Sequence, residues 1–387
     1  MPDVYISADN IISSLGFTTQ ENISNIKKNI TGIKLIDNRN ISPTPIYASS
    51  VNSERLYSDF KKFDNPEDFT RFEQMAILSI IDALRNTKVD IKNKNTLLII
   101  STTKGNIDIL EQSNKNRFDN KKIYLWNTAK LLQNYFENPN MPVIVSNACI
   151  SGLLGIIIGS RLIQSSQFEN VIITGGDILS EFVVSGFQSF LSLSTVPCQP
   201  FDVSRDGLSL GEGFGTIILT SNPEFVNDDI KITVAGGSSS NDANHISGPS
   251  RTGEGLYITI KNTLKEAGAK SLNHIDYISA HGTGTVYNDE MESKAITRAG
   301  LENVPVNSFK GYWGHTLGAA GIVESIAAIN SMKENTLYKT MGFDKSGVSK
   351  NINIIRNEEK AEINNCLKIA SGFGGCNAGV VFQKQIS

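Results

Sequence analysis

Short apolar runs alternate with longer segments of helical periodicity along most of this chain. The apolar runs are rich in β-branched residues and are bounded by turn residues, a pattern typical of strands. The predicted strands are 96–101, 143–145, 171–174, 216–219, 230–235, 275–279, 366–370 and 378–382. The predicted helices are 67–86, 150–166, 254–268, 289–300 and 318–334. This alternation favours an α/β protein whose strands are covered by helices on both faces.

Two segments of the chain have the same order of predicted elements. In the first, an apolar strand over 141–145 leads to Cys149 and then to a helix start rich in small residues. In the second, 304–306 leads through a loop to His315 and another helix start rich in glycine and alanine. The shared design suggests an internal repeat.

The first of these helices carries three glycines, Gly152, Gly155 and Gly159, at spacings of three and four. Such spacing places them on one helix face. Because glycine inside a helix costs about 1 kcal/mol relative to alanine, this face predicts the close approach of another helix. We infer two similar halves, 1–225 and 226–387, that press two central helices together and are joined by a polar, turn-rich connector.

Composition and charge narrow the class of protein. The chain has 387 residues, of which 40% are hydrophobic and 19% charged, enough for a substantial core. A net charge of −3 argues against a nucleic-acid partner. The four cysteines form no CxxC pair, which argues against a metal site or a disulfide framework and favours a cytoplasmic setting. We expect neither a signal peptide nor a membrane span.

Cys149 lies at a predicted strand-to-helix turn, next to a helix N-terminus. The partial positive charge at a helix start favours thiolate over thiol, and such a turn exposes a side chain as the nucleophile elbow does. A reactive nucleophile is therefore one interpretation. A small buried hydrophobe is the other, because free cysteines are among the residues most often buried.

Two of the four histidines lie in loops of small residues. His281 follows an apolar strand, at the end where α/β sheets place active sites, and Thr283 and Thr285 offer hydroxyls to an extended polar chain. Lys310 precedes His315 by five residues, among glycines and aromatics. The alternatives are a turn with a structural histidine, and a solvated lysine beside a core histidine.

A glycine-rich turn over 371–375 joins the last two predicted strands. Its backbone N–H groups suit an oxyanion, although a tight β-turn has the same composition. The remaining histidines, His245 and His274, lie in polar contexts and are interpreted as ordinary residues.

Together these segments resemble the β-ketoacyl-acyl-carrier-protein synthases, condensing enzymes of the thiolase-fold superfamily. The matching motifs occur in the family's order over nearly the whole chain. They are Ala148–Gly152, Pro200–Gly207 with Gly211–Gly213, His281–Thr285 with Asp289 and Glu292, Lys310 with Gly314–His315 and Gly318–Gly321, and Gly372–Gly375. The resemblance implies an α/β thiolase-like fold, with two similar βαβ halves in a layered α-β-α-β-α arrangement.

The resemblance also implies roles around the nucleophile. Cys149 would attack an acyl thioester and hold the acyl group covalently. His281 and His315 would flank the carbonyl of a malonyl thioester and support its decarboxylation. Lys310 would order the site, with Glu292 as its charge partner. The implied reaction is a decarboxylative condensation in fatty acid, polyene or polyketide elongation.

Other residues would hold the substrate. By resemblance, the backbone N–H groups of Cys149 and Phe373 form the oxyanion hole, and Phe373 also gates the acyl pocket. Thr283 and Thr285 would bind a phosphopantetheine arm. That arm arrives on an acyl carrier protein, so no tightly bound cofactor is implied. The family is generally dimeric, which implies a homodimer or a heterodimer with a related subunit.

The chain departs from the family's usual residues at several positions. Val286 stands where many relatives have proline, and Phe309 precedes the lysine. Tyr312 and Trp313 are bulkier than the usual residues. We expect these changes to reshape the pocket of a specialised subgroup.

Two other functions share this fold. Cys376 replaces a common threonine and keeps open a thiolase with a second catalytic cysteine. A non-catalytic chain-length subunit is the other, although it usually lacks the nucleophile that Cys149 would supply. An active subunit that works with such a partner remains an alternative. The acyl chain depends on pocket loops such as 104–112 and 185–196, whose side chains the sequence does not place.

Overall fold

Two sets of five strands form the centre of the computed structural model, which describes residues 1–114, 117–242, 248–268 and 275–385. His245 and His274 lie outside the described residues. The first set is β1 (Tyr5–Ile12), β4 (Thr96–Ser101), β5 (Val143–Val145), β6 (Asn170–Asp177) and β8 (Gly213–Thr220). The second is β9 (Ile232–Asn241), β10 (Tyr277–Ser279), β11 (Val306–Asn307), β14 (Asn365–Gly372) and β15 (Cys376–Lys384). All eight predicted strands are present. Of the other two, β11 corresponds to the segment 304–306 that leads to His315, and β1 was not predicted.

The strands of the two halves follow one order. From the edge inward, the first half runs β5-β4-β6-β8-β1 and the second runs β11-β10-β14-β15-β9. In each half, the second strand in sequence pairs in parallel with the third and fourth, and the fourth pairs antiparallel with the fifth. β1 and β9 join the halves through the pair Tyr5–Thr233. The repeated order confirms two similar halves; their division at residue 225 stays a prediction.

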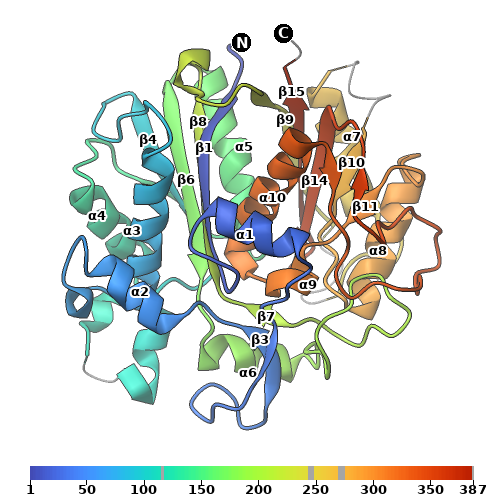
Figure 1. Ribbon diagram of the computed structural model, residues 1–387, viewed down its shortest axis with the longest axis horizontal. Coiled ribbons are helices and arrows are strands. Elements are labelled where there is room, and N and C mark those ends of the chain that lie inside the picture. The colour runs from blue at the N-terminus through green and yellow to red at the C-terminus, as the bar shows by residue number, and fades with distance from the viewer. Residues whose placement is uncertain (115–116, 243–247, 269–274, 386–387) are drawn as a thin grey trace.

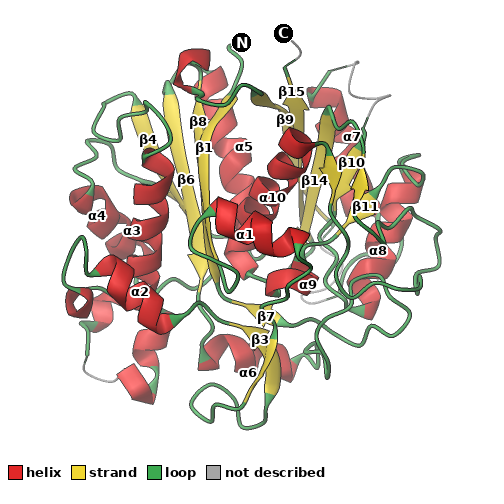
Figure 2. Cartoon of the chain, in the orientation of Figure 1, coloured by secondary structure: helices red, strands yellow, loops and turns green. Residues whose placement is uncertain are grey.

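Helices cover the strands and fill the space between the halves (Figures 1 and 2). The outer helices are α3 (Arg71–Leu84) and α4 (Leu125–Tyr135) on the first half, and α7 (Glu254–Glu266) and α8 (Val286–Arg298) on the second. The central helices are α5 (Ser151–Gln164) and α10 (Ala320–Glu334). The layers therefore follow the expected α-β-α-β-α arrangement, and most residues of the two central helices are buried.

Shorter elements close the edges of these layers. They are α1 (Thr19–Lys27), β2 (Lys34–Ile36), β3 (Ile46–Ser49), α2 (Ser53–Phe60), α6 (Glu181–Ser189), β7 (Leu210–Gly211), α9 (Lys310–Trp313), β12 (Thr336–Leu337) and β13 (Glu359–Lys360). The 3-10 turns are η1 (Pro66–Asp68), η2 (Ile107–Leu110), η3 (Gln112–Asn114), η4 (Asn120–Ile123), η5 (Pro223–Phe225) and η6 (Leu317–Ala319). Within the described ranges, no helix has the length and apolar character to cross a membrane.

The glycines of α5 serve two different contacts. A Cβ on Gly152 would lie 2.8 Å from the backbone oxygen of Gly318, and a Cβ on Gly321 of α10 would lie 2.3 Å from the backbone of α5. These glycines let the two central helices touch. Cβ atoms on Gly155 and Gly159 would instead meet side chains of β4 and β6, at 2.7 and 3.1 Å. The prediction that all three glycines of α5 face a helix is therefore wrong for two of them, which let α5 lie close to the sheet.

Candidate active site

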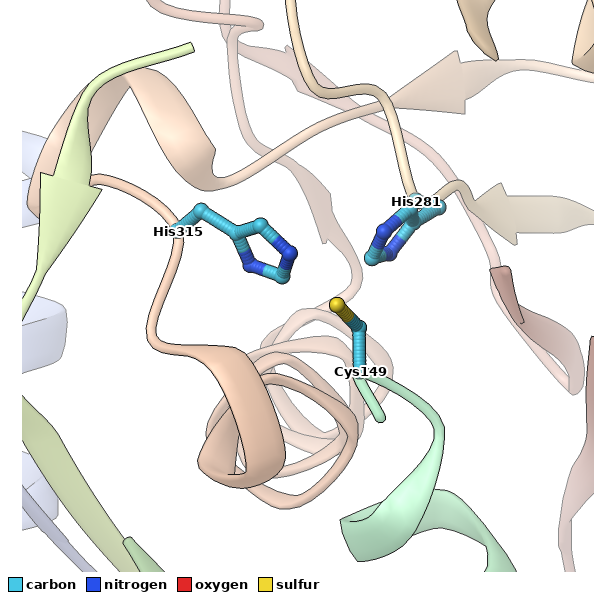
Figure 3. Close-up of side chains that lie close together, drawn as sticks. All are labelled: Cys149, His281 and His315. Atoms are coloured by element: carbon cyan, nitrogen blue, oxygen red, sulfur yellow. The ribbon is translucent and has the colours of Figure 1, made fainter. Parts of the chain in front are cut away.

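Cys149 occupies a strained turn between β5 and α5. The residue before it, Ala148, has a φ of +43°, a conformation that residues with side chains rarely adopt. The Ser151 hydroxyl braces the turn, because it accepts from a backbone N–H at 2.8 Å and donates to the oxygen of Ala148 at 2.6 Å. The thiol points toward His281 and His315 (Figure 3), and its sulfur lies within 4.8 Å of a nitrogen on each ring. Three segments far apart in sequence thus converge.

Burial controls the protonation of the thiol. Cys149 is 7% exposed. Burial raises the pKa of its thiol to about 12, although nearby Lys310 acts in the opposite direction. A helix start stabilises a nearby anion by about 0.3–2 kcal/mol, which is too little to offset such a rise. Burial therefore outweighs the helix start, and the thiol needs a base.

Two neutral imidazoles face this thiol. The rings of His281 and His315 are nearly perpendicular, with centroids 5.0 Å apart. Burial holds the pKa of each imidazole well below its usual value, and Lys310 adds to the effect. Among the described residues, Nδ1 of His315 has no hydrogen-bond partner. Each neutral ring offers one N–H donor and one lone pair, so a ring whose lone pair is not engaged by another donor can accept the thiol proton.

Lys310 determines which nitrogen of His281 carries the proton. Its Nζ lies 3.2 Å from Nδ1 of His281 and also donates to the backbone oxygen of the same residue. An ammonium group has three donors and no acceptor, so Nδ1 must accept and Nε2 must carry the proton. His281 is therefore a donor through Nε2–H.

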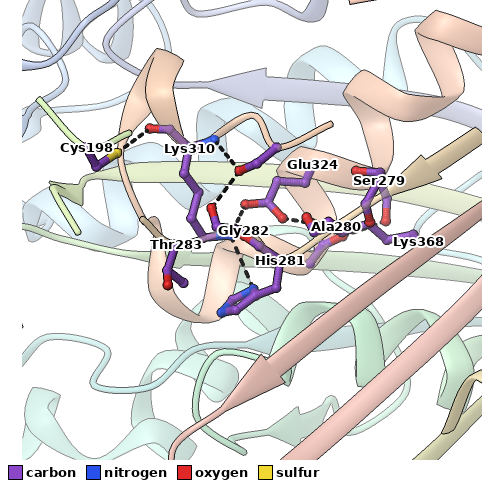
Figure 4. Close-up of polar contacts among 12 residues, drawn as sticks. Cys198, Ser279, Ala280, His281, Gly282, Thr283, Lys310, Glu324 and Lys368 are labelled. Carbon is purple, nitrogen blue, oxygen red and sulfur yellow. Dashed lines mark hydrogen bonds and ion pairs between the residues drawn. The ribbon is translucent and has the colours of Figure 1, made fainter. Parts of the chain in front are cut away.

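The charge partner of Lys310 is Glu324 on α10. Nζ of Lys310 lies 2.6 Å from Oε1 of Glu324, and both side chains are almost completely buried (Figure 4). Glu292 on α8 accepts instead from the backbone N–H groups of His281 at 2.7 Å and Gly282 at 2.6 Å. The prediction that Glu292 pairs with Lys310 is therefore wrong. Its carboxylate positions the loop that carries His281.

Glu324 and Lys368 are candidates that the sequence analysis missed. Lys368 lies on β14, and its Nζ is 2.6 Å from the second oxygen of Glu324. The sequence does contain a signal for both residues. A glutamate inside an apolar helix and a lysine inside an apolar strand are rare unless they are paired.

The thiol and the imidazoles open into a pocket of about 420 Å³. The ring of Phe373 stands beside it, 5.5 Å from the ring of Phe187 and 5.3 Å from that of Phe190. All three rings line the pocket and form an aromatic wall. The segment 185–196 thus shapes the pocket as expected, whereas none of the described residues of 104–112 lines it.

The turn that carries Phe373 touches the backbone of the nucleophile. A Cβ on Gly372 would lie 3.1 Å from the backbone nitrogen of Cys149 and 2.9 Å from the sulfur of Cys376. Only glycine leaves this approach open. The two backbone segments assigned to an oxyanion hole therefore adjoin, and the role itself stays a prediction.

The hydroxyls of Thr283 and Thr285 lie 2.8 Å apart on the wall of the same pocket. Val286 also lines it, as expected for a residue that shapes the pocket. Three bulky residues lie instead in the hydrophobic core and are completely buried: Phe309, Tyr312 and Trp313. The prediction that these three reshape the pocket is therefore wrong.

Comparison with known proteins bears on both halves of the chain. Residues 1–224 match the family model described as "Beta-ketoacyl synthase, N-terminal domain", and residues 232–344 match "Beta-ketoacyl synthase, C-terminal domain". The chain belongs to the β-ketoacyl synthase family. This confirms the resemblance that the motifs carry.

Individual β-ketoacyl synthases match different lengths of this chain. The 3-oxoacyl-(acyl-carrier-protein) synthase 2 of Staphylococcus aureus (strain COL) is 25% identical, over 98% of each chain. That of Rhizobium meliloti (strain 1021) is 33% identical over 65% of this chain and 62% of its own. A ketosynthase from Xenorhabdus doucetiae, solved in complex with its chain length factor, is 25% identical, covers 99% of this chain and 98% of its own, and has a TM-score of 0.86.

Proposed function

We propose that this β-ketoacyl synthase condenses an acyl chain held on Cys149 with a malonyl group carried by an acyl carrier protein, with loss of CO₂. One observation carries the proposal. A thiol and two neutral imidazoles, from three separate segments, share one pocket with an aromatic wall. A thiol can hold an acyl group, and two N–H donors can stabilise an enolate.

The first half-reaction moves the acyl group. The Cys149 thiol gives its proton to a neutral imidazole, and its sulfur attacks the carbonyl carbon of the incoming thioester. The tetrahedral oxyanion accepts from the backbone N–H groups of Cys149 and Phe373. When this intermediate collapses, the bond to the carrier's sulfur breaks, and that sulfur takes the proton from the imidazolium. Cys149 is then a thioester, and both imidazoles are neutral again.

The second half-reaction forms the carbon–carbon bond. The malonyl carboxylate leaves as CO₂, and its bonding electrons form an enolate whose oxygen accepts from His281 and His315. The enolate carbon attacks the acyl carbon on Cys149. The carbon–sulfur bond then breaks, and the sulfur takes up one proton from solvent, which balances the charge of the lost carboxylate and restores the thiol. Lys310 supports this step because it keeps His281 in the tautomer that donates through Nε2–H.

We assign the carrier's phosphopantetheine arm to Thr283 and Thr285, whose hydroxyls lie on the pocket wall. The acyl carrier protein is the proposed partner, in line with the names of the synthases that this chain is similar to. No tightly bound cofactor takes part in this chemistry. We place the reaction in the cytoplasm, since free and buried cysteines suit a reducing compartment.

A second candidate is an active ketosynthase that works with a chain-length partner. The similarity to the Xenorhabdus doucetiae ketosynthase, which was solved with such a factor, favours it. Either form is proposed to be a dimer, because β5 ends the sheet as a half-exposed edge strand. Light scattering separates them: two identical chains support a homodimer, and a monomer that pairs only with a related subunit supports the second candidate.

Mass spectrometry of the intact protein tests the proposed reaction. After exposure to acyl-carrier thioesters of graded length, the wild type should gain one acyl group and should extend it with malonyl-carrier. Cys149→Ala should keep its fold and gain no acyl group. Cys376→Ser is the matched control, and it should load and condense as the wild type does. Condensation with acetyl but not with malonyl thioesters would favour the thiolase and refute the proposal.

A further inference from the structure

Glu324 is shared by two buried lysines (Figure 4). Its Oε1 lies 2.6 Å from Nζ of Lys310, and its Oε2 lies 2.6 Å from Nζ of Lys368. The two lysine side chains are 0% exposed and the glutamate is 1% exposed. One carboxylate between two ammonium groups leaves one positive charge in excess. Such a charge is costly to bury, so its place beside two histidines calls for a chemical explanation.

The contacts of Lys368 require a full ammonium group. Its Nζ donates to Glu324, to the backbone oxygen of Ala280 at 3.0 Å and to that of Ser279 at 3.3 Å. All three partners are acceptors, so Nζ uses three protons. These contacts also hold the end of β10, immediately before His281.

Lys310 holds the next backbone carbonyl along the chain, that of His281. Its Nζ donates to the backbone oxygen of His281 and lies 3.2 Å from Nδ1 of the same ring. Two ammonium groups therefore hold the carbonyls of three consecutive residues, 279–281, and one glutamate holds both ammonium groups. The position of Lys310 against the ring depends on how Glu324 is divided between the two lysines.

Other titratable groups also lie around His281. Glu292 is engaged by the backbone N–H groups of His281 and Gly282, and burial together with Asp289 raises the pKa of Glu292 to about 7. The thiol on the opposite side is neutral at rest. The charged or titratable groups that face His281 come from different helices, strands and loops. They are Cys149, Glu292, Lys310, His315, Glu324 and Lys368. Two ammonium groups that share one carboxylate therefore lie next to the imidazoles, and both lower the pKa of His281.

We propose that Lys368 is a positioning residue for the condensation. Through Glu324 and the carbonyls of β10, it holds Lys310 against His281, and its positive charge favours the enolate. This inference rests on the proposed function. Without Lys368, both oxygens of Glu324 become available to Lys310, which draws Lys310 away from Nδ1 and removes the excess charge. Acyl loading forms no enolate, so it depends less on Lys368.

Three variants of the full-length protein test this role: Lys368→Met removes the charge, Lys368→Arg keeps it, and Lys122→Met is the matched control. Lys122 also pairs with a buried glutamate, Glu73, at 2.7 Å, and it does not line the pocket. Acyl loading and CO₂ release from malonyl-carrier are measured separately across pH. The chain has only four histidines, so NMR can follow each imidazole titration. Thermal unfolding establishes that each variant is folded.

For Lys368→Met we expect acyl loading within about threefold of the wild type and CO₂ release lower by about tenfold or more. In the plot of CO₂ release rate against pH, the acid limb should move to higher pH by on the order of one unit, because loss of a nearby positive charge raises the imidazole pKa. Lys368→Arg and Lys122→Met should keep the wild-type limb.

An equal loss of both half-reactions in Lys368→Met, with no displaced limb, would overturn the proposal, as would unchanged CO₂ release. If Lys368→Met does not fold, the pH profile of Lys368→Arg tests the proposal instead. A folded arginine variant with a displaced limb would refute the charge argument, and one with the wild-type limb would support it. Failure of the wild type to release CO₂ would refute the proposed function itself, which keeps the two outcomes distinct.

Discussion

Replacing Gly321 by alanine tests the contact between the two central helices. A Cβ at this position would lie 2.3 Å from the backbone nitrogen of Leu153 and 3.0 Å from its Cα. Ordinary van der Waals contact begins at 3.4 Å, so α5 and α10 must separate by 3.4 − 2.3 = 1.1 Å. No flexible side chain can absorb this displacement, because the contacted atoms belong to the backbone.

The expected loss of stability follows from two opposing effects. A Gly→Ala change in an open helix gains about 1 kcal/mol. Overpacking a close-packed contact costs about 1–3 kcal/mol or more, and a backbone contact belongs at the upper end. We expect a net loss of about 2 kcal/mol. With an unfolding entropy of about 2.1 cal/mol/K per residue, this lowers the Tm of the 387-residue chain by about 2–3 °C.

Gly186→Ala is the matched control, since a Cβ on this residue of α6 meets nothing within 4 Å. It should raise stability by up to about 1 kcal/mol, whereas Gly321→Ala should lower it, and denaturant unfolding measures both. Acyl loading is the second readout. The central helices begin next to Cys149 and His315, so their separation should slow transfer to the thiol. A Gly321→Ala protein as stable as the wild type would refute the backbone contact.

The buried titratable groups of the site lead to three more predictions. Glu324→Gln leaves two buried lysines uncompensated and should cost about 3–5 kcal/mol in urea unfolding, so an unchanged midpoint would contradict the shared ion pair. Glu292→Gln offers one acceptor to the two N–H groups of His281 and Gly282, so CO₂ release should fall; wild-type release would argue against a positioning role. Because the pKa values of His281 and His315 are lowered on folding, the unfolded chain binds more protons below about pH 6.5. The contribution of these two histidines to the free energy of unfolding should therefore fall as pH drops below 6.5, whereas carboxyl groups whose pKa values are raised by burial, such as Glu111 and Glu292, act in the opposite direction. The stability difference between the wild type and His281→Gln, measured by urea titration at each pH, isolates the contribution of His281.

Hydrophobic periodicity predicted the layers because most of the strands are buried on both faces and are continuously apolar. β1 escaped detection because Asp9 and Asn10 interrupt its apolar residues. In the structure, Asp9 accepts from the hydroxyl of Thr19 and Asn10 donates to the backbone oxygen of Phe17. Such partners make a polar residue compatible with a central strand, and only the folded chain brings them together.

The convergence of Cys149, His281 and His315 could be predicted from the resemblance to the β-ketoacyl synthases, because the strand ends alone left a structural role open for each residue. The partner of Lys310 could not. Glu292 and Glu324 both lie on helices close to Lys310 in sequence, and the choice between them depends on which helix packs beneath the lysine. Side-chain pairing across layers is a property of packing, which neither spacing nor composition encodes.

Burial acts on the thiol and the imidazoles with opposite sign, and the result is a site of neutral groups. It raises the pKa of Cys149, and it lowers those of His281 and His315. Proton transfer from thiol to imidazole therefore stays inside the pocket, and acyl loading begins and ends without net charge. Decarboxylation differs, because it consumes a carboxylate and forms an enolate. That anion forms beside the excess positive charge of Lys310 and Lys368, so the charged cluster should affect condensation far more than loading.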